Sequence, residues 1–209
     1  MSLILILEQV LNGLQFGVML FLMAAGLTLV FGVMGLINLA HGALYMVGAF
    51  AAAAVAGWTG SFVLALMASL AAAAAAGALV EVTVIRRLYD RDHLDQVLAT
   101  FALILIFSEG TRWTFGSFPL FLDKPDWLSG TVMLPLGIEY SLYRLAISLV
   151  GLIVAAGLFW MIARTRIGIR IRAGENDREM IAALGVNISL LYTFVFALGA
   201  ALAGLAGAL

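Results

Sequence analysis

The sequence has no cysteine, a single lysine and little charge of either sign. Without cysteine, the chain forms neither disulfide bonds nor thiolate metal sites. Asp, Glu, Lys and Arg make up only 11% of its 209 residues, and the net charge is −1. Nucleic-acid-binding proteins need a basic patch, which a pI near 6.1 does not suggest. We therefore expect no nucleic-acid partner.

Charge is absent altogether from the long stretch between Gln9 and Val80. Hydrophobic residues make up 64% of the chain, and the mean hydropathy of +1.12 lies far outside the range of soluble domains. The composition therefore predicts an integral membrane protein.

A helix needs about 20 apolar residues to cross a bilayer. The chain offers six such segments, which predict an all-α, polytopic transmembrane helix bundle forming one domain over residues 1–209. The second crossing has an alternative, because glycines at 32, 35 and 42 are also typical of a re-entrant segment. The six predicted crossings are 10–33, 35–57, 62–85, 97–115, 142–163 and 191–209.

The arginines predict the orientation of the bundle. Eight of the eleven basic residues fall in two connections, residues 86–91 and 164–178. Because loops rich in Lys and Arg stay in the cytoplasm, both connections should be cytoplasmic. Counting crossings then places the N-terminus and the connection 116–140 outside.

Small residues spaced four apart let membrane helices approach closely. Gly13 with Gly17, and the series Gly199, Ala203 and Gly207, have this spacing and predict ordinary packing contacts within a bundle. We also expect the chain to be part of a longer protein, with further helices packing on residues 191–209.

Several classes of enzyme are excluded by missing motifs. A phosphate-binding loop ends in Gly-Lys-Ser/Thr, but the only lysine, Lys124, follows Asp123 in an exterior connection. The chain has no Gly-x-Ser-x-Gly, no His-Glu-x-x-His and no acidic pair within a crossing. We expect no enzyme activity, no cofactor and no metal. What remains is a pore or transporter body driven by a partner.

A channel or a secondary transporter is the second interpretation, and an intramembrane enzyme a distant third. Ion coupling calls for carboxylates at the centre of the bilayer. Glu81 and Glu109 instead fall near the ends of crossings. Glu109 with Arg112 is predicted to form an exterior interfacial cluster, and Glu81 near Arg86 its cytoplasmic equivalent.

Polar side chains within the crossings are the candidates for a transport pathway, because unpaired polar groups are costly in lipid. The candidates are Asn12, Gln15, Thr28, Asn38, His41 and Tyr45. Each has a structural alternative. Asn12 and Gln15 can bond a neighbouring helix, and Thr28 its own preceding turn. Asn38 and His41 can pair with backbone groups freed where glycines interrupt the helix, a role we favour over substrate contact.

The cytoplasmic connection 164–190 contains a short predicted helix. Asn176 and Glu179 have the spacing of a capping box, which starts a helix, and Gly185 with Asn187 supplies its end. Met180, Ile181 and Leu184 would then share one apolar face. That face either rests on the protein's own surface or docks a partner.

Two sets of residues along the chain resemble the LivH-type permeases of branched-chain amino acid ABC importers. In order along the chain, the matching N-terminal positions are Asn12-Gly13, Gly17, Ala25-Gly26, Thr28, Phe31-Gly32, Ile37-Asn38, His41-Gly42 and Gly48-Ala49. A second set resembles the family's coupling loop: Gly168, Arg172-Ala173, Glu175-Asn176, Ala182-Ala183 and Gly185-Val186-Asn187.

This resemblance implies an importer subunit of the bacterial inner membrane. Its partners would be two ABC ATPases, a second permease chain and a periplasmic solute-binding protein. The coupling residues would be Asn176, Glu179, Met180, Ile181, Ala182, Ala183, Leu184 and Gly185. Related permeases for urea or short amides share much of the signature, so the substrate has that alternative.

Overall fold

Six long helices form the framework of the protein. The computed structural model describes residues 3–118, 120–135 and 137–209. Six of the helices in this described part are long and apolar enough to span a membrane, which confirms the predicted crossings. They are α1 (Leu3–Met34), α2 (His41–Thr59), α3 (Phe62–Thr83), α4 (His93–Phe115), α5 (Leu142–Arg164) and α8 (Ile188–Ala208).

The connections contain shorter elements, of which only the helix that overlaps residues 176–185 was predicted. In the connection between α4 and α5, η2 (Asp126–Leu128) precedes an antiparallel hairpin of β1 (Thr131–Leu134) and β2 (Ile138–Ser141). The arginine-rich connections contain η1 (Ile85–Arg87), α6 (Arg166–Asn176) and α7 (Arg178–Ala183).

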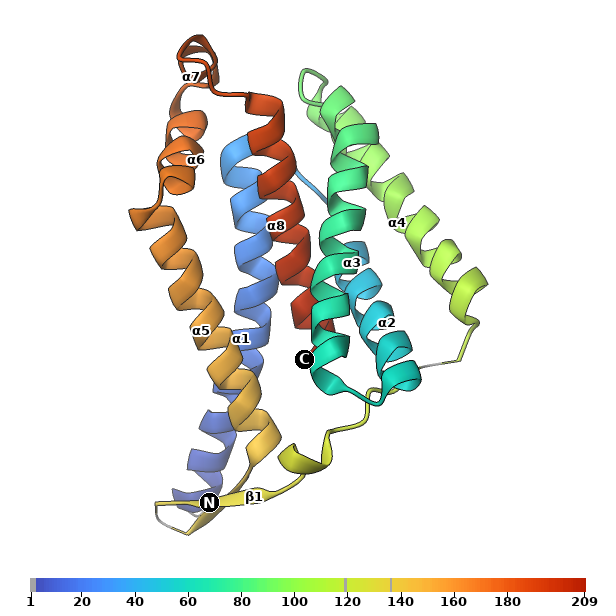
Figure 1. Cartoon of the computed structure of the whole chain (residues 1–209), viewed down its shortest axis with the longest axis vertical. Coiled ribbons are helices and arrows are strands. Elements are labelled where there is room, and N and C mark those ends of the chain that lie inside the picture. The colour runs from blue at the N-terminus through green and yellow to red at the C-terminus, as the bar shows by residue number, and fades with distance from the viewer. Residues whose placement is uncertain (1–2, 119, 136) are drawn as a thin grey trace.

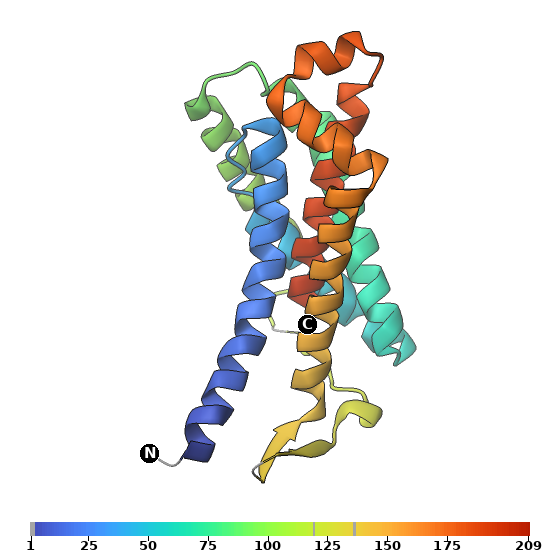
Figure 2. The same cartoon turned by 90° about the vertical axis from the view of Figure 1, so that its left-hand side faces the viewer.

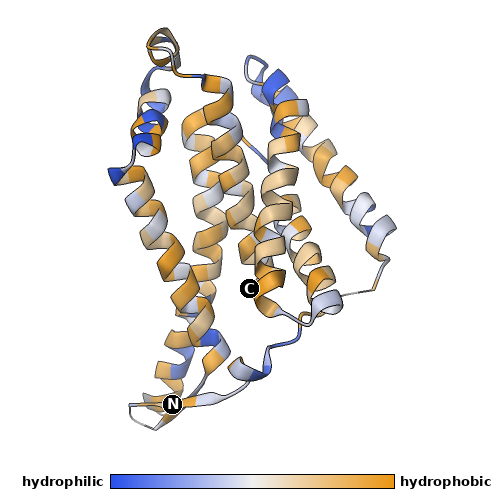
Figure 3. Ribbon diagram, viewed as in Figure 1, coloured by the Kyte–Doolittle hydropathy of each residue, from blue (hydrophilic) through white to orange (hydrophobic). Residues whose placement is uncertain are grey.

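Both arginine-rich connections lie at the same end of the bundle, and the start of α1 and the hairpin lie at the other (Figure 1). Hydrophilic residues gather toward these two ends, and the helices between them are mostly hydrophobic (Figure 3). Clustering of the arginines at one end is the arrangement that the positive-inside rule requires.

Helix α8 forms the centre of the bundle and packs against α1, α2 and α3. Glycines bring the backbones together: a Cβ built on Gly48 of α2 would lie 2.2 Å from the Cα of Gly204, and one built on Gly26 of α1 would lie 2.5 Å from the Gly199 oxygen. Lipid provides no hydrophobic drive for helix association. Close backbone contacts of this kind therefore supply the attraction between the helices.

The predicted small-residue series in α8 is confirmed as a packing surface, because Gly199, Ala203 and Gly207 all contact helices of this chain or are buried among them. The prediction for Gly13 and Gly17 is wrong for the described residues, since a Cβ at either would meet nothing within 4 Å.

A side chain at Gly204 should destabilise the bundle. In Gly204→Val, the new Cβ would lie 2.4 Å from the Cβ of Ala73, and overpacking of this kind costs about 1–3 kcal/mol. We expect a lower melting temperature in detergent and a lower abundance in membranes. Gly13→Val is the matched control and should behave as wild type, because its Cβ meets open space. Equal melting of both variants would contradict the central packing of α8.

Candidate functional site

The first candidate site is the break between α1 and α2. Helix α1 ends at Met34, Gly35 adopts a positive φ of 64°, and α2 begins only at His41. The predicted interruption of the second crossing is therefore present at Gly35. Gly42 lies inside α2 and interrupts nothing.

The side chain of Asn38 organises this break. Its Oδ1 accepts a hydrogen bond from the backbone N–H of Ala40 at 3.0 Å, which is the local turn that Asn favours. The backbone oxygen of Asn38 accepts from His41 N at 3.4 Å. The side chain is only 3% exposed. Asn38 thus accepts a hydrogen bond from a backbone N–H that the helix break leaves free, which is the structural role predicted for it.

The ring of His41 ties the start of α2 to α1. It is 3% exposed, and its Nε2 lies 3.1 Å from the carbonyl oxygen of Met23. A carbonyl only accepts, so Nε2 carries the proton and Nδ1 is an acceptor. Gly26 makes room for the ring, since a Cβ there would lie 3.1 Å from the imidazole.

Two polar atoms at the break have no hydrogen-bond partner among the residues that the structure describes. They are Nδ2 of Asn38, a donor, and Nδ1 of His41, an acceptor. Buried polar atoms are normally paired, so this unpaired donor and acceptor, three residues apart, are candidates for contact with a further polar group.

The second candidate site is a cavity of about 510 Å³ between α1, α5 and α6. Most of its lining is apolar and includes Leu29 and Leu158. Three polar side chains also line it: Thr28 of α1, and Arg172 and Glu175 of α6. Helix α6 passes over the ends of α1 and α5 at the arginine-rich end of the bundle (Figure 2), and its Arg172 and Glu175 line the cavity.

The polar lining of this cavity was only partly predicted. Thr28 was a candidate pathway residue, but Arg172 and Glu175 were noted only as part of the second matching motif. Residues 166–176 were expected to be loop, whereas they form the amphipathic helix α6, capped by the Thr165 hydroxyl, which accepts from Gly168 N at 3.2 Å. The available signal was the four-residue spacing of Arg166 with Arg170 and of Ile167 with Ile171, which is typical of a helix.

The third candidate site is α7, at the arginine-rich end. Its cap is Asp177, whose Oδ1 accepts from Met180 N at 2.9 Å. The prediction of Asn176 as the cap is wrong, because α6 continues through Asn176 and its Nδ2 donates to Arg172 O at 2.9 Å. Gly185 ends the helix as predicted, with a φ of 84°.

Only part of the predicted apolar face of α7 is exposed. Met180 and Leu184 are 62% and 75% exposed, whereas Ile181 is 6% exposed. At the end of α7, the carbonyl oxygen of Ile181 accepts from Val186 N at 3.2 Å, and Gly185 N donates to Ala182 O, which forms a tight helix end. Glu179, Ala182 and Ala183 are exposed.

Comparison with known proteins identifies the family. The model of the family described as "Branched-chain amino acid transport system / permease component" matches residues 9–209. The chain belongs to this permease family. No solved structure matches the chain significantly.

Curated relatives of this permease are similar along nearly its whole length. The high-affinity branched-chain amino acid transport system permease protein BraD of Pseudomonas aeruginosa is 31% identical, over 97% of this chain and 70% of the relative. The LivH permease proteins of Salmonella typhimurium and Escherichia coli K12 are each 27% identical, with the same coverage. The permease is therefore a multi-pass membrane protein of a transport system.

The structure does not bring the six predicted pathway residues of the permease together. Asn12 accepts from the Arg144 guanidinium, and Gln15 Nε2 lies 3.7 Å from the sulfur of Met19. Asn12 therefore contacts a neighbouring helix, as its structural alternative predicts, whereas Gln15 contacts a residue of its own helix, α1. Tyr45 packs its backbone against Gly207 of α8.

Replacement of His41 by alanine should destabilise the permease. His41→Ala removes the buried bond to Met23 and leaves a void beside Gly26, at a cost of about 1–3 kcal/mol. The melting temperature in detergent and the membrane abundance should fall together. His93→Ala is the control, because that histidine is exposed at the start of α4. A wild-type melting curve for His41→Ala would refute the structural role.

Proposed function

We propose that this chain is the permease subunit of an ABC importer that carries branched-chain aliphatic amino acids across the bacterial inner membrane. The observation that carries the proposal is the family match over residues 9–209, with relatives named as permeases of such systems. Two ABC ATPases would supply the energy. A second permease chain would complete the pathway, and a periplasmic binding protein would deliver the substrate.

The cavity beside α6 has the chemistry that such a substrate needs. A branched-chain amino acid has an aliphatic side chain, a carboxylate and an ammonium group. Leu29 and Leu158 suit the side chain, while Arg172 and Glu175 carry charges opposite to those of the two end groups. Thr28 adds a hydroxyl. A volume of about 510 Å³ is ample for one amino acid.

The cavity is lined by α6 and by the halves of α1 and α5 that are nearer the arginine-rich end of the bundle. We therefore assign it to the last part of the pathway, before release into the cytoplasm. Thr28 is the pathway candidate with the strongest support. Asn38 and His41 lie at the helix break, and their unpaired atoms are a second polar position along the route.

Helix α7 is the proposed docking point for an ATPase. Met180 and Leu184 present an apolar surface outside the membrane-spanning segments, with Glu179, Ala182 and Ala183 exposed around it. A hydrogen bond from Met180 N to Asp177 Oδ1 at its start, and one from Gly185 N to Ala182 O at its end, hold the helix in shape. Ile181 anchors it to the protein.

Uptake measurements test the substrate and the cavity together. With its ATPases, second permease and binding protein in proteoliposomes, the protein should import leucine, and valine or isoleucine should compete. Inhibition by urea or acetamide in place of these amino acids would favour the alternative substrates. Glu175→Gln should reduce leucine uptake roughly tenfold by removing the partner of the ammonium group.

Arg170→Gln is the matched control for the cavity. Arg170 is an exposed arginine on the same helix, but it lines a different surface groove, with Leu184 and Leu190. It should transport leucine at the wild-type rate. If both substitutions had the same effect, a general disturbance of α6 would explain the loss, and the cavity assignment would fall.

Charge placed on α7 should block ATPase docking. Ala183→Glu and Leu184→Glu each put a carboxylate on the exposed apolar surface, where burial against a partner would strand the charge. We expect the ATPase to be lost on copurification and uptake to be abolished, with the melting temperature unchanged. Asp90→Ala, in the other arginine-rich connection, is the control. Normal copurification of the α7 variants would rule out docking there.

A further inference from the structure

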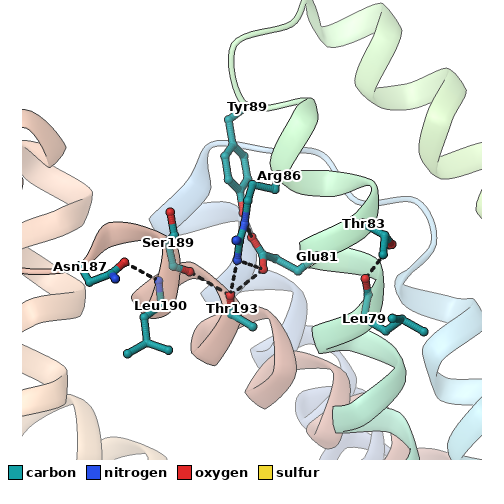
Figure 4. A network of polar contacts seen from close by, with 9 residues as sticks. All are labelled: Leu79, Glu81, Thr83, Arg86, Tyr89, Asn187, Ser189, Leu190 and Thr193. Carbon is teal, nitrogen blue, oxygen red and sulfur yellow. Dashed lines mark hydrogen bonds and ion pairs between the residues drawn. The ribbon is translucent and has the colours of Figure 1, made fainter.

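Glu81, in the last turn of α3, is fully buried and receives hydrogen bonds from three side chains (Figure 4). Arg86 donates from Nε to Oε1 at 3.2 Å and from Nη2 to Oε2 at 2.9 Å. Tyr89 donates its hydroxyl to Oε1, and Thr193 donates to Oε2, both at 2.6 Å. The predicted ion pair of Glu81 with Arg86 is therefore present, but Glu81 is a buried carboxylate and not an interfacial one.

The donors come from different parts of the chain. Arg86 and Tyr89 belong to the connection between α3 and α4, whereas Thr193 lies in α8, more than a hundred residues later. Arg86 Nη2 also donates to the Thr193 oxygen at 2.8 Å, which closes the network. Burial and the bond to Glu81 raise the pKa of Tyr89, so its hydroxyl stays a donor at neutral pH.

Thr193 places this network beside the docking segment. Helix α8 begins at Ile188, only a few residues after α7 ends at Ala183. Asn187 caps α8 by accepting from Leu190 N at 3.0 Å (Figure 4). A displacement of α7 therefore reaches the first turns of α8 through a short connection.

Contacts between α3 and α8 continue along both helices. The Ser69 hydroxyl donates to Gly204 O at 2.6 Å, and a Cβ on Gly77 would lie 2.4 Å from the Cβ of Ala200. The Glu81 network joins the same two helices at the arginine-rich end. Because packed surfaces and buried charge networks keep one register, these contacts make α3 and α8 move together.

We propose that Glu81 is a positioning residue of the transport cycle, which holds α3 and α8 as one rigid unit so that motion of α7 reaches the centre of the bundle. The inference rests on the proposed docking of an ATPase at α7. Without the Thr193 bond, α8 turns at its docking end independently of α3, and ATP hydrolysis no longer produces a full conformational change.

Thr193→Val tests the proposal, because it removes the hydroxyl at nearly constant shape. Leucine uptake and ATP hydrolysis are measured in the assembled importer. We expect the ATP consumed per leucine to rise at least fivefold, with normal ATPase copurification. Thr193→Ser should restore the wild-type ratio. Thr83→Val is the matched control, since that hydroxyl bonds only within α3, to Leu79 O at 2.7 Å (Figure 4).

A distance measurement separates this proposal from the proposed function. The absence of native cysteine allows spin labels at Val82→Cys and Leu190→Cys, both exposed positions beside the network. The label distance should stay constant between nucleotide-free and ATP-bound importer, and its distribution should broaden in Thr193→Val.

A constant ATP-to-leucine ratio in Thr193→Val, or a nucleotide-dependent distance in wild type, overturns the proposal. Failure of the wild-type complex to import leucine overturns the proposed function alone, because the label distance still reports whether Thr193 fixes α8 to α3.

Discussion

Close backbone contact around α8 is the constraint on which the rest of this structure depends. In lipid, helix association removes no apolar surface from water, so the hydrophobic effect does not drive it. Helices therefore associate where their surfaces fit closely. Gly26, Gly48 and Gly77 each meet α8 at distances that leave no room for a side chain. The three helices around α8 are thereby fixed in rotation, which aims His41 at α1 and Glu81 at α8.

The crossings could be predicted from the sequence because hydropathy is a local property. A run without charge from Gln9 to Val80 admits few structures other than helices in lipid. The helix break was also predictable, since Gly35 and Asn38 are residues that break and rebuild a turn. Family membership followed from motifs that keep their order along the chain, and the comparisons confirm it.

The errors arose where burial depends on distant residues. Glu81 looks interfacial from its place near the end of a crossing, but α8 covers it with Thr193. Ile181 fits an exposed apolar face by periodicity, but it is buried against the rest of the protein. Asn176 fits a capping box, but the preceding helix α6 already includes it. The cavity could not be predicted at all, because three separate helices form it.

The length of α1 has a consequence for how the protein sits in a bilayer. Its 32 residues rise about 48 Å, at 1.5 Å each, whereas the hydrocarbon core is only about 30 Å thick. The helix must therefore tilt or project into the headgroups. Asn12 lies 22 residues before Met34, or about 33 Å along the axis. Its partner Arg144 thus reaches the outer headgroup layer, where a guanidinium keeps its hydration. Membrane thickness thereby sets the depth at which α1 and α5 are joined.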